Sequence, residues 1–319
     1  MNQDDGHNDP LYPAIEPFAS GELAVSGGHR IYFEQSGRPD GFPVLFLHGG
    51  PGSQSRPQHR RYFDPSYYRI VLFDQRGCGR SMPAGETAEN TTAHLIADIE
   101  RLRRELGVER WLLFGGSWGS ALALAYSVAY PGRVAGLILR GVFLASSAEL
   151  DWFLHGLRAF IPEQVAKLHD GERGNLLQRY HAEVNHPDRR TAFAAAQRWM
   201  AYEEQVMGIG NPAPDAANGA DQAAAINRTR VQMHYLASDC FLRERELLES
   251  AWRVTSHAII VQGRLDMVCP PVTAYELSRC LPSCELRMIE SGGHSGAQPA
   301  IAQALRRAAD DMRTLVSQS

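Results

Sequence analysis

The sequence predicts an α/β fold with a mostly parallel, eight-stranded sheet, helices on both of its faces and an inserted helical region. Near-continuous apolar runs are typical of parallel strands that are buried on both faces. Amphipathic helical patterns alternate with these runs, and one long helical stretch interrupts the alternation. The five apolar runs are residues 43–47, 69–73, 111–114, 134–139 and 257–261. A length of 319 residues suits one large core with an inserted subdomain.

The first elements are predicted to form the edge of this sheet. Residues 23–26 and 30–35 alternate polar and apolar side chains on either side of Gly27-Gly28, as expected of an antiparallel hairpin. A helix is then expected from about residue 91 until Gly107, because four leucines and isoleucines share one stripe of it. A second helix follows Ser117 and ends at Pro131-Gly132.

The strand pattern disappears over residues 146–253, where helical patterns rich in aromatic residues are broken by a glycine- and proline-containing stretch at 208–214 and an Ala/Asp/Asn/Gly-rich stretch. It returns at 257–261 and 284–289, so the helical region interrupts one sheet. We therefore expect a core formed by 1–145 and 254–319 and a cap formed by 146–253. The cap should cover the carboxyl edge of the sheet, where open α/β folds bind ligands.

The composition and charge of the chain narrow the range of expected partners and locations. The chain has 44% hydrophobic and 21% charged residues and a formal charge of −4, which gives no electrostatic reason to expect nucleic acid or a membrane as partner. The first 17 residues lack the pattern of a secretory signal, and no apolar run approaches 18 residues. Five scattered cysteines suggest reduced thiols. We expect a cytoplasmic protein.

The segment G-G-S-W-G at residues 115–119 fits G-x-S-x-G and lies directly between an apolar strand and a helix. This is the context of a nucleophile elbow, which holds a serine in a strained turn at the top of an α/β-hydrolase sheet. A serine hydroxyl also needs an imidazole and an orienting carboxylate. Asp266 and His294 follow later strands in the chain order of this fold, so Ser117, Asp266 and His294 are the predicted triad.

The glycine-rich loop at 48–52, H-G-G-P-G, follows another strand. It can direct a backbone amide at a developing oxyanion, and we assign the oxyanion hole to the amides of Gly50 and Trp118. We expect His48 to hold the loop. Neither a phosphate-binding pattern nor H-E-x-x-H occurs, so no cofactor or metal is expected.

These motifs resemble the proline iminopeptidases, also called prolyl aminopeptidases. The similarity covers nearly the whole chain and includes five further motifs, at residues 73–81, 115–120, 139–143, 263–266 and 293–295. It implies an α/β-hydrolase fold and release of N-terminal proline from peptides through an acyl-enzyme. It also implies that Ser117 is the nucleophile, His294 the general base and acid, and Asp266 the orienting carboxylate.

The same resemblance implies carboxylates that bind the substrate amine. Glu203 matches the first, in W-M-A-Y-E at 199–203, with Tyr202 in place of a second tryptophan. Gln232 stands where the family has a second glutamate, and Gln298 stands where it usually has another. Each missing carboxylate would weaken the binding of a cation by about 1–3 kcal/mol.

The remaining candidates for substrate contact also come from the resemblance. Arg140 and Phe143 match family residues near the pocket, and Phe153 stands where a tyrosine is usual. Cys269 is expected to be a small buried hydrophobe. Three functions stay open: an aminopeptidase for short peptides, an esterase or amidase for a different small-molecule substrate, and a non-catalytic binding protein of the same fold.

Overall fold

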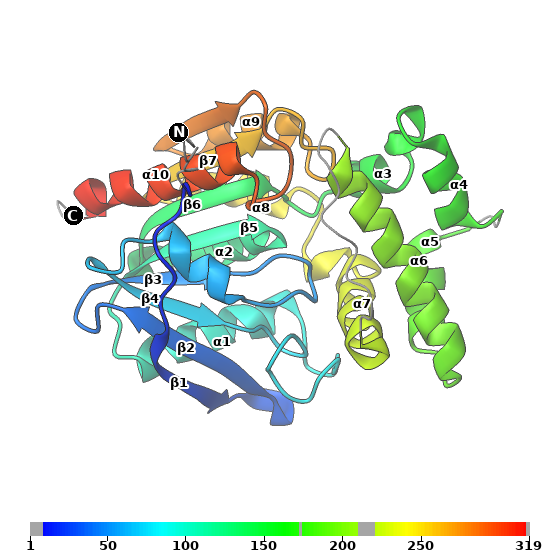
Figure 1. Cartoon of the computed structure of the whole chain (residues 1–319), viewed down its shortest axis with the longest axis horizontal. Helices are drawn as coiled ribbons and strands as arrows, with labels where there is room; N and C mark the ends of the chain where they lie inside the picture. Colours follow the sequence, from blue (N-terminus) through cyan, green and yellow to red (C-terminus); the bar gives the residue numbers. More distant parts are fainter. Residues whose placement is uncertain (1–8, 172–173, 210–220, 317–319) are drawn as a thin grey trace, which may run out of the picture.

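The computed structural model describes residues 9–171, 174–209 and 221–316, and its centre is an eight-stranded sheet (Figure 1). The strand order is β1-β2-β4-β3-β5-β6-β7-β8. The strands are β1 (Pro17–Ala24), β2 (Arg30–Gly37), β3 (Phe42–Leu47), β4 (Tyr68–Phe73), β5 (Trp111–Ser117), β6 (Val134–Val142), β7 (His257–Gly263) and β8 (Cys284–Ile289). The predicted fold class, with its mostly parallel eight-stranded sheet, is confirmed.

The hairpin edge of the sheet is antiparallel, and the rest of the sheet is parallel. β1 pairs with β2 and β2 with β4 in the antiparallel sense, whereas every pairing among β3 to β8 is parallel. β1 begins at Pro17 and not near Leu23, where the sequence predicted it. Its first six residues alternate between partly and fully exposed positions, so this half lacks the apolar signal of a buried strand.

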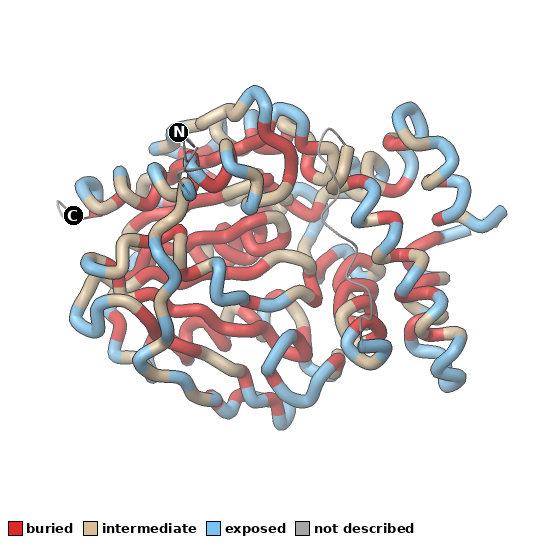
Figure 2. Tube along the Cα trace, viewed as in Figure 1, coloured by how far each residue is buried: buried red, intermediate tan, exposed pale blue. Residues whose placement is uncertain are grey.

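Side-chain alternation along the strands divides the core into two layers. In β3, Val44 and Phe46 belong to one apolar cluster, and Leu45 and Leu47 belong to the other. The layer that contains Leu45 is covered by α1 (Thr92–Glu105), α2 (Trp118–Ala129) and α9 (Pro271–Cys280), and the opposite layer by α10 (Pro299–Val316). The central strands β3 to β7 are mostly buried while the turns and outer helix faces are exposed (Figure 2), as expected of strands covered on both faces.

In the described part of the chain, six α-helices lie between β6 and β7, although these two strands are direct neighbours in the sheet. They are α3 (Ser147–Leu154), α4 (Pro162–His169), α5 (Leu176–Val184), α6 (Arg189–Gly208), α7 (Gln222–Leu236) and α8 (Glu246–Ser250). Figure 1 shows α3 to α7, in green to yellow, grouped at one end of the sheet. α8 packs against α2 and α9. The division into core and cap at residues 146 and 253 stays a prediction.

Side-chain caps explain where several of these helices begin. Thr91 accepts a hydrogen bond from the amide of His94 at the start of α1, and Ser146 forms a capping box with Glu149 at the start of α3. Such caps satisfy backbone amides that have no partner inside the helix. Most of the glycine- and proline-containing break expected at 208–214, the stretch up to residue 220 and the first eight residues lie outside the described ranges.

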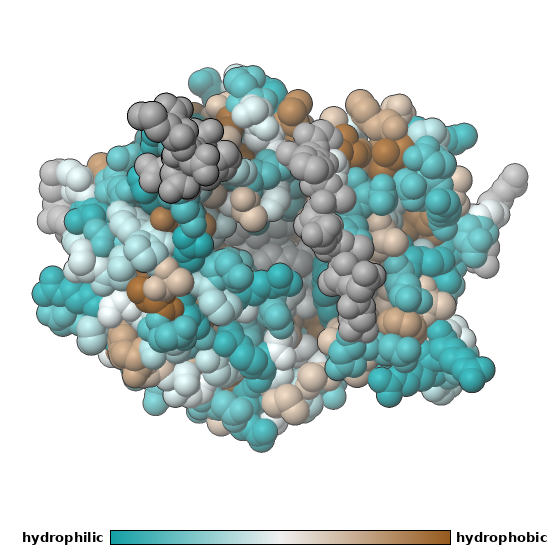
Figure 3. Space-filling view, in the orientation of Figure 1, coloured by the Kyte–Doolittle hydropathy of each residue, from teal (hydrophilic) through white to brown (hydrophobic). Residues whose placement is uncertain are grey.

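The surface is mainly hydrophilic on the face shown in Figure 3, with small scattered apolar spots. None of the helices in the described part of the chain is both long and apolar enough to cross a membrane. All five cysteines are free thiols, and three of them are buried: Cys78, Cys240 and Cys269.

Candidate active site

Ser117 lies at a sharp turn where β5 ends and α2 begins. Its backbone angles are φ 56° and ψ −128°, a region that costs a non-glycine residue about 1–3 kcal/mol. The turn also brings two backbones into contact, because a Cβ atom on Gly119 would lie 2.1 Å from the carbonyl oxygen of Leu47. This contact leaves no room for a side chain at position 119, which must therefore be glycine. The turn places the hydroxyl of Ser117 next to the N-terminus of α2.

His294 and Asp266 meet in the loops that follow β8 and β7. His294 Nδ1 lies 2.8 Å from Asp266 Oδ2 and 3.0 Å from Oδ1. Asp266 is 1% exposed, and its Oδ1 accepts hydrogen bonds from the amides of Val268 and Cys269. His294 and Ser117 line one cavity. The structure thus brings the three predicted residues to the same edge of the sheet.

Gln262 supports the buried carboxylate and was not anticipated from the sequence. Its Nε2 lies 3.3 Å from Asp266 Oδ2 and donates to the carbonyl oxygen of Cys269 at 2.9 Å. Its Oε1 accepts from the amide of Val142 at 3.1 Å. A glutamine inside an apolar strand, such as 257–263, is the only sequence signal that points to it.

The glycine-rich loop at 48–52 lies between the elbow and the cap. Gly50 lines the cavity beside Ser117, with φ 118°, a conformation that favours glycine. A Cβ on Gly52 would lie 2.3 Å from the carbonyl oxygen of Arg228 in α7. The amide of Trp118 belongs to the first turn of α2, where no intrahelical acceptor exists. Both predicted oxyanion-hole amides are therefore near Ser117.

Segment 73–81, one of the motifs noted in the sequence, contacts this loop. Gln75 donates from its backbone amide to His48 Nε2 at 3.0 Å and from its side chain to the carbonyl oxygen of His48 at 2.8 Å. Its Oε1 accepts from the indole of Trp118 at 2.9 Å. Burial lowers the pKa of His48, so its imidazole is neutral and Nε2 can accept. One glutamine thus ties the loop to the elbow.

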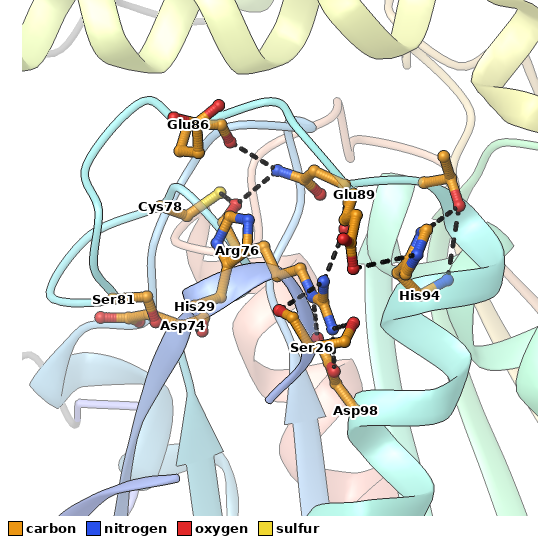
Figure 4. Close-up of polar contacts among 12 residues, drawn as sticks. Ser26, His29, Asp74, Arg76, Cys78, Ser81, Glu86, Glu89, His94 and Asp98 are labelled. Carbon is orange, nitrogen blue, oxygen red and sulfur yellow. Dashed lines mark hydrogen bonds and ion pairs between the residues drawn. The ribbon is translucent and has the colours of Figure 1, made fainter. Parts of the chain in front are cut away.

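Arg76, in the same segment, joins the first hairpin to α1. Its guanidinium donates to the two carboxylate oxygens of Asp98 at 2.6 and 2.7 Å and to the backbone carbonyls of Ser26 and Glu89 (Figure 4). Burial raises the pKa of Asp98, and the bonds from Arg76 act in the opposite direction. Arg76 lines neither cavity beside Ser117, so its contacts are structural.

Two adjoining cavities lie beside Ser117. The outer cavity has a volume of about 510 Å³ and the inner one about 60 Å³. Both are lined by Gly50, Ser117, Phe153, Glu203 and Val268. All five predicted substrate-contact residues line one or both: Arg140 the outer cavity, Phe143 and Gln232 the inner cavity, and Phe153 and Glu203 both.

Glu203 is held by two donors. Gln232 Nε2 donates to its Oε1 at 2.5 Å, and Arg228 Nη2 donates to its Oε2 at 2.9 Å. The indole of Trp199 donates to Gln232 Oε1 at 3.0 Å, which turns the amide nitrogen of Gln232 towards Glu203. Arg228 was not predicted from the sequence, because an arginine on a cap helix has no local signal that distinguishes it from a solvated residue.

Gln298 does not belong to the pocket, and this part of the sequence interpretation was wrong. It lines neither cavity beside Ser117, and its Oε1 accepts from the amide of Gly293 at 2.7 Å. The side chain therefore braces the loop that carries His294. Relative to the expected amine site, the pocket lacks one carboxylate, at Gln232, and not two.

Cys269 lines the inner cavity and is 2% exposed. Burial raises the pKa of its thiol well above the ordinary value, while a hydrogen bond with Ser117 lowers it. The sulfur therefore lies next to the serine as a neutral thiol. Within residues 9–171, 174–209 and 221–316, no group of three or more His, Cys, Asp or Glu side chains could hold a metal ion.

The matching family model and the sequence relatives agree on the family to which the chain is similar. Residues 43–297 match the model of the alpha/beta hydrolase fold family. The chain is 42% identical over 314 residues to a proline iminopeptidase of Arabidopsis thaliana, covering 96% of this chain and 83% of the relative. It is 40% identical to the proline iminopeptidase of Neisseria gonorrhoeae, covering 95% and 98%.

Solved structures agree on the fold. The crystal structure of proline iminopeptidase from Mycobacterium smegmatis aligns with a TM-score of 0.63 at 17% identity, covering 94% of this chain and 99% of that one. This identity supports the fold alone, whereas the sequence relatives carry the family assignment. The chain belongs to the proline iminopeptidase family of the α/β-hydrolase fold.

Proposed function

We propose that this protein is a serine aminopeptidase that releases N-terminal proline, or a similar small residue, from short peptides. One observation carries the proposal: the carboxylate of Glu203 lines the same two cavities as Ser117. A free amine that is partly removed from water needs such a partner. The relatives that share about two fifths of the sequence are named for this activity.

The inner cavity has the chemistry of a site for a proline ring. It is lined by side chains that are largely apolar: Phe143, Leu150, Phe153, Trp199, Leu236 and Val268. Glu149, which also lines it, is engaged by the amides of Leu144 and Ser146. Glu203 is therefore the carboxylate left to receive the ring nitrogen.

The proposed mechanism uses protein groups and water. Ser117 attacks the carbonyl carbon while His294 Nε2 takes the hydroxyl proton, and Asp266 fixes the tautomer and stabilises the imidazolium. The amides of Gly50 and Trp118 stabilise the oxyanion. His294 then protonates the leaving amine, and an acyl-enzyme remains on Ser117. Water next gives a proton to His294 and attacks the acyl carbon; the bond to Ser117 breaks, proline is released, and His294 returns the proton to the serine oxygen.

A second candidate is an esterase or amidase that does not require a free amine. It is favoured by the state of Glu203, whose two oxygens already accept hydrogen bonds from Gln232 and Arg228. In this alternative Glu203 orders the cap, and the substrate is a neutral ester or amide.

The test compares three substrates: a proline arylamide, the N-acylated proline arylamide and a short-chain aryl ester. The proposal expects rapid cleavage of the free-amine substrate only, with a loss of at least about 10⁴-fold in Ser117→Ala. Glu203→Gln should lower kcat/KM for the proline arylamide by about 10- to 100-fold. Preference for the ester or the acylated amide would establish the second candidate.

We also propose a cytoplasmic location and small-molecule or short-peptide substrates. The free state of all five cysteines supports a reducing compartment, because disulfides persist mainly in oxidising ones. Fractionation of cells that express a tagged chain tests the location, and secretion of the protein would contradict it.

A further inference from the structure

The outer cavity carries an excess of positive charge. Three arginines line it, Arg56, Arg140 and Arg228, together with a single carboxylate, Glu203. Glu203 is already paired with Arg228. Neither Arg56 nor Arg140 forms an ion pair with a carboxylate in the part of the chain that the structure describes. A cavity of this kind favours an anionic ligand.

Arg140 is the guanidinium closest to the reacting groups. It comes from the carboxyl end of β6, and its Nη1 lies 2.8 Å from the carbonyl oxygen of His294 and 3.2 Å from His294 Nε2. A Cβ on Gly116, next to Ser117, would lie 2.5 Å from its Nη2. The charge is therefore fixed beside the nitrogen that must protonate the leaving group.

In a bound dipeptide, the geometry of the chain would place the free carboxylate close to Arg140. The leaving nitrogen has to come within about 3 Å of His294 Nε2 to receive its proton. In a dipeptide the carboxylate carbon is two bonds, or about 2.5 Å, from that nitrogen. In a longer peptide or an amide the same position carries a neutral carbonyl group. Only the free carboxylate can form an ion pair with Arg140.

We propose that Arg140 binds the α-carboxylate of the residue that leaves, so that the enzyme is selective for dipeptides. The proposal rests on the aminopeptidase function above and names its substrate class. The inner cavity and Glu203 hold the N-terminal residue, and Arg140 holds the carboxyl end one residue later. The two ends of a dipeptide are thus recognised by opposite charges on either side of Ser117.

The test uses two substrates that differ only in this charge, Pro-Gly and Pro-Gly amide, at pH 7. Wild type should cleave Pro-Gly with a kcat/KM at least about tenfold higher than that for Pro-Gly amide. Arg140→Gln should bring the ratio close to one. The matched control is Arg56→Gln, which removes an exposed charge from the same cavity and should leave the ratio within about threefold of wild type.

Each outcome decides the proposal. Equal rates for the two substrates in wild type overturn it, and so does a ratio that survives in Arg140→Gln or disappears only in Arg56→Gln. If Arg140→Gln does not fold, Arg140→Lys replaces it: the ratio should fall but stay above one, and an unchanged ratio counts against the assignment. Cleavage of the amide and the arylamide without preference for Pro-Gly refutes only the carboxylate site, whereas no cleavage of any prolyl substrate refutes the aminopeptidase function.

Discussion

Ser117, the proposed nucleophile, has a strained backbone. Its φ of 56° is a conformation that L-residues avoid, and the close contact of Gly119 with β3 leaves the turn no room to relax. The packing of β5 and α2 therefore maintains a local conformation that is unfavourable in itself. The strain serves to expose the hydroxyl above the sheet.

Replacing Ser117 with glycine should separate strain from chemistry. Ser117→Gly and Ser117→Ala both lack the hydroxyl and should be equally inactive. Only glycine relieves the left-handed φ, so Ser117→Gly should be more stable than Ser117→Ala by about 1 kcal/mol, after the greater entropy of unfolded glycine is counted. Urea unfolding of the two variants measures the difference, and equal midpoints would show that the turn is not strained.

His48 should make the protein sensitive to acid. Burial holds its pKa below the ordinary 6.5, so the unfolded chain binds a proton near that pH while the folded chain does not. The free energy of unfolding should therefore be highest above pH 6.5 and fall as the pH drops below it. His48→Gln removes this titration and should show a shallower loss between pH 7.5 and 5 in urea unfolding. Parallel pH profiles for the two proteins would contradict the assignment.

At the scale of elements, the loop at 48–52 connects the elbow to the cap. On one side Gly49 lies against the carbonyl oxygen of Gly116 and the side chain of Ser117, and on the other side Gly52 meets the carbonyl of Arg228 in α7. The position of the amide of Gly50, which we propose for the oxyanion hole, therefore depends on a helix of the inserted region. Loop and cap form one structural unit at this point.

A methyl group at Gly52 should disturb this unit. Gly52→Ala combines an unfavourable φ of 91° with a contact of 2.3 Å to a backbone oxygen. We expect a loss of more than about 2 kcal/mol in stability and at least about tenfold in kcat/KM for a proline arylamide. The control is Gly28→Ala, which has a φ of 74° and no neighbour within 4 Å. It should cost about 1–2 kcal/mol and keep its activity; similar effects of both variants would exclude a role for the contact.

The sequence predicted those elements whose side chains carry a local signal. Strands such as β5 and β7 are buried on both faces and therefore read as apolar runs. The elbow and the loop with Asp266 follow such strands directly, whereas the loop with His294 follows β8, a partly exposed strand at the edge of the sheet. The first half of β1 was missed because its exposed edge needs no apolar residues. The pairing of Glu203 with Arg228 was missed because it depends on how α6 packs against α7, which neither residue's neighbours in the chain specify.

At the scale of the whole molecule, burial sorts the thiols by accessibility. Cys280 is exposed, whereas Cys78, Cys240 and Cys269 are buried and their pKa values are raised by burial. Burial also raises the pKa of Cys284, to about 11. Only the thiolate reacts with a disulfide reagent, so folding should protect four of the five thiols.

Titration with Ellman's reagent measures this protection. In the native protein Cys280 should react within minutes and the others far more slowly, and in denaturant all five should react. Cys280→Ser should remove the fast phase. A fast phase of three or more thiols in the native protein would mean that buried thiols such as Cys78 and Cys240 are not closed off from solvent.

The contact between Gly52 and α7 also limits how the protein can be altered. Arg228 meets the loop through its carbonyl and Glu203 through its guanidinium, so one residue touches both the carboxylate proposed to bind the substrate amine and the loop proposed to stabilise the oxyanion. A cap taken from a relative would bring a different α7 and with it a different position of the loop. Substrate specificity and reaction rate should therefore be coupled through Arg228. A chimaera with an exchanged cap, designed to change the specificity, should be expected to change the rate as well.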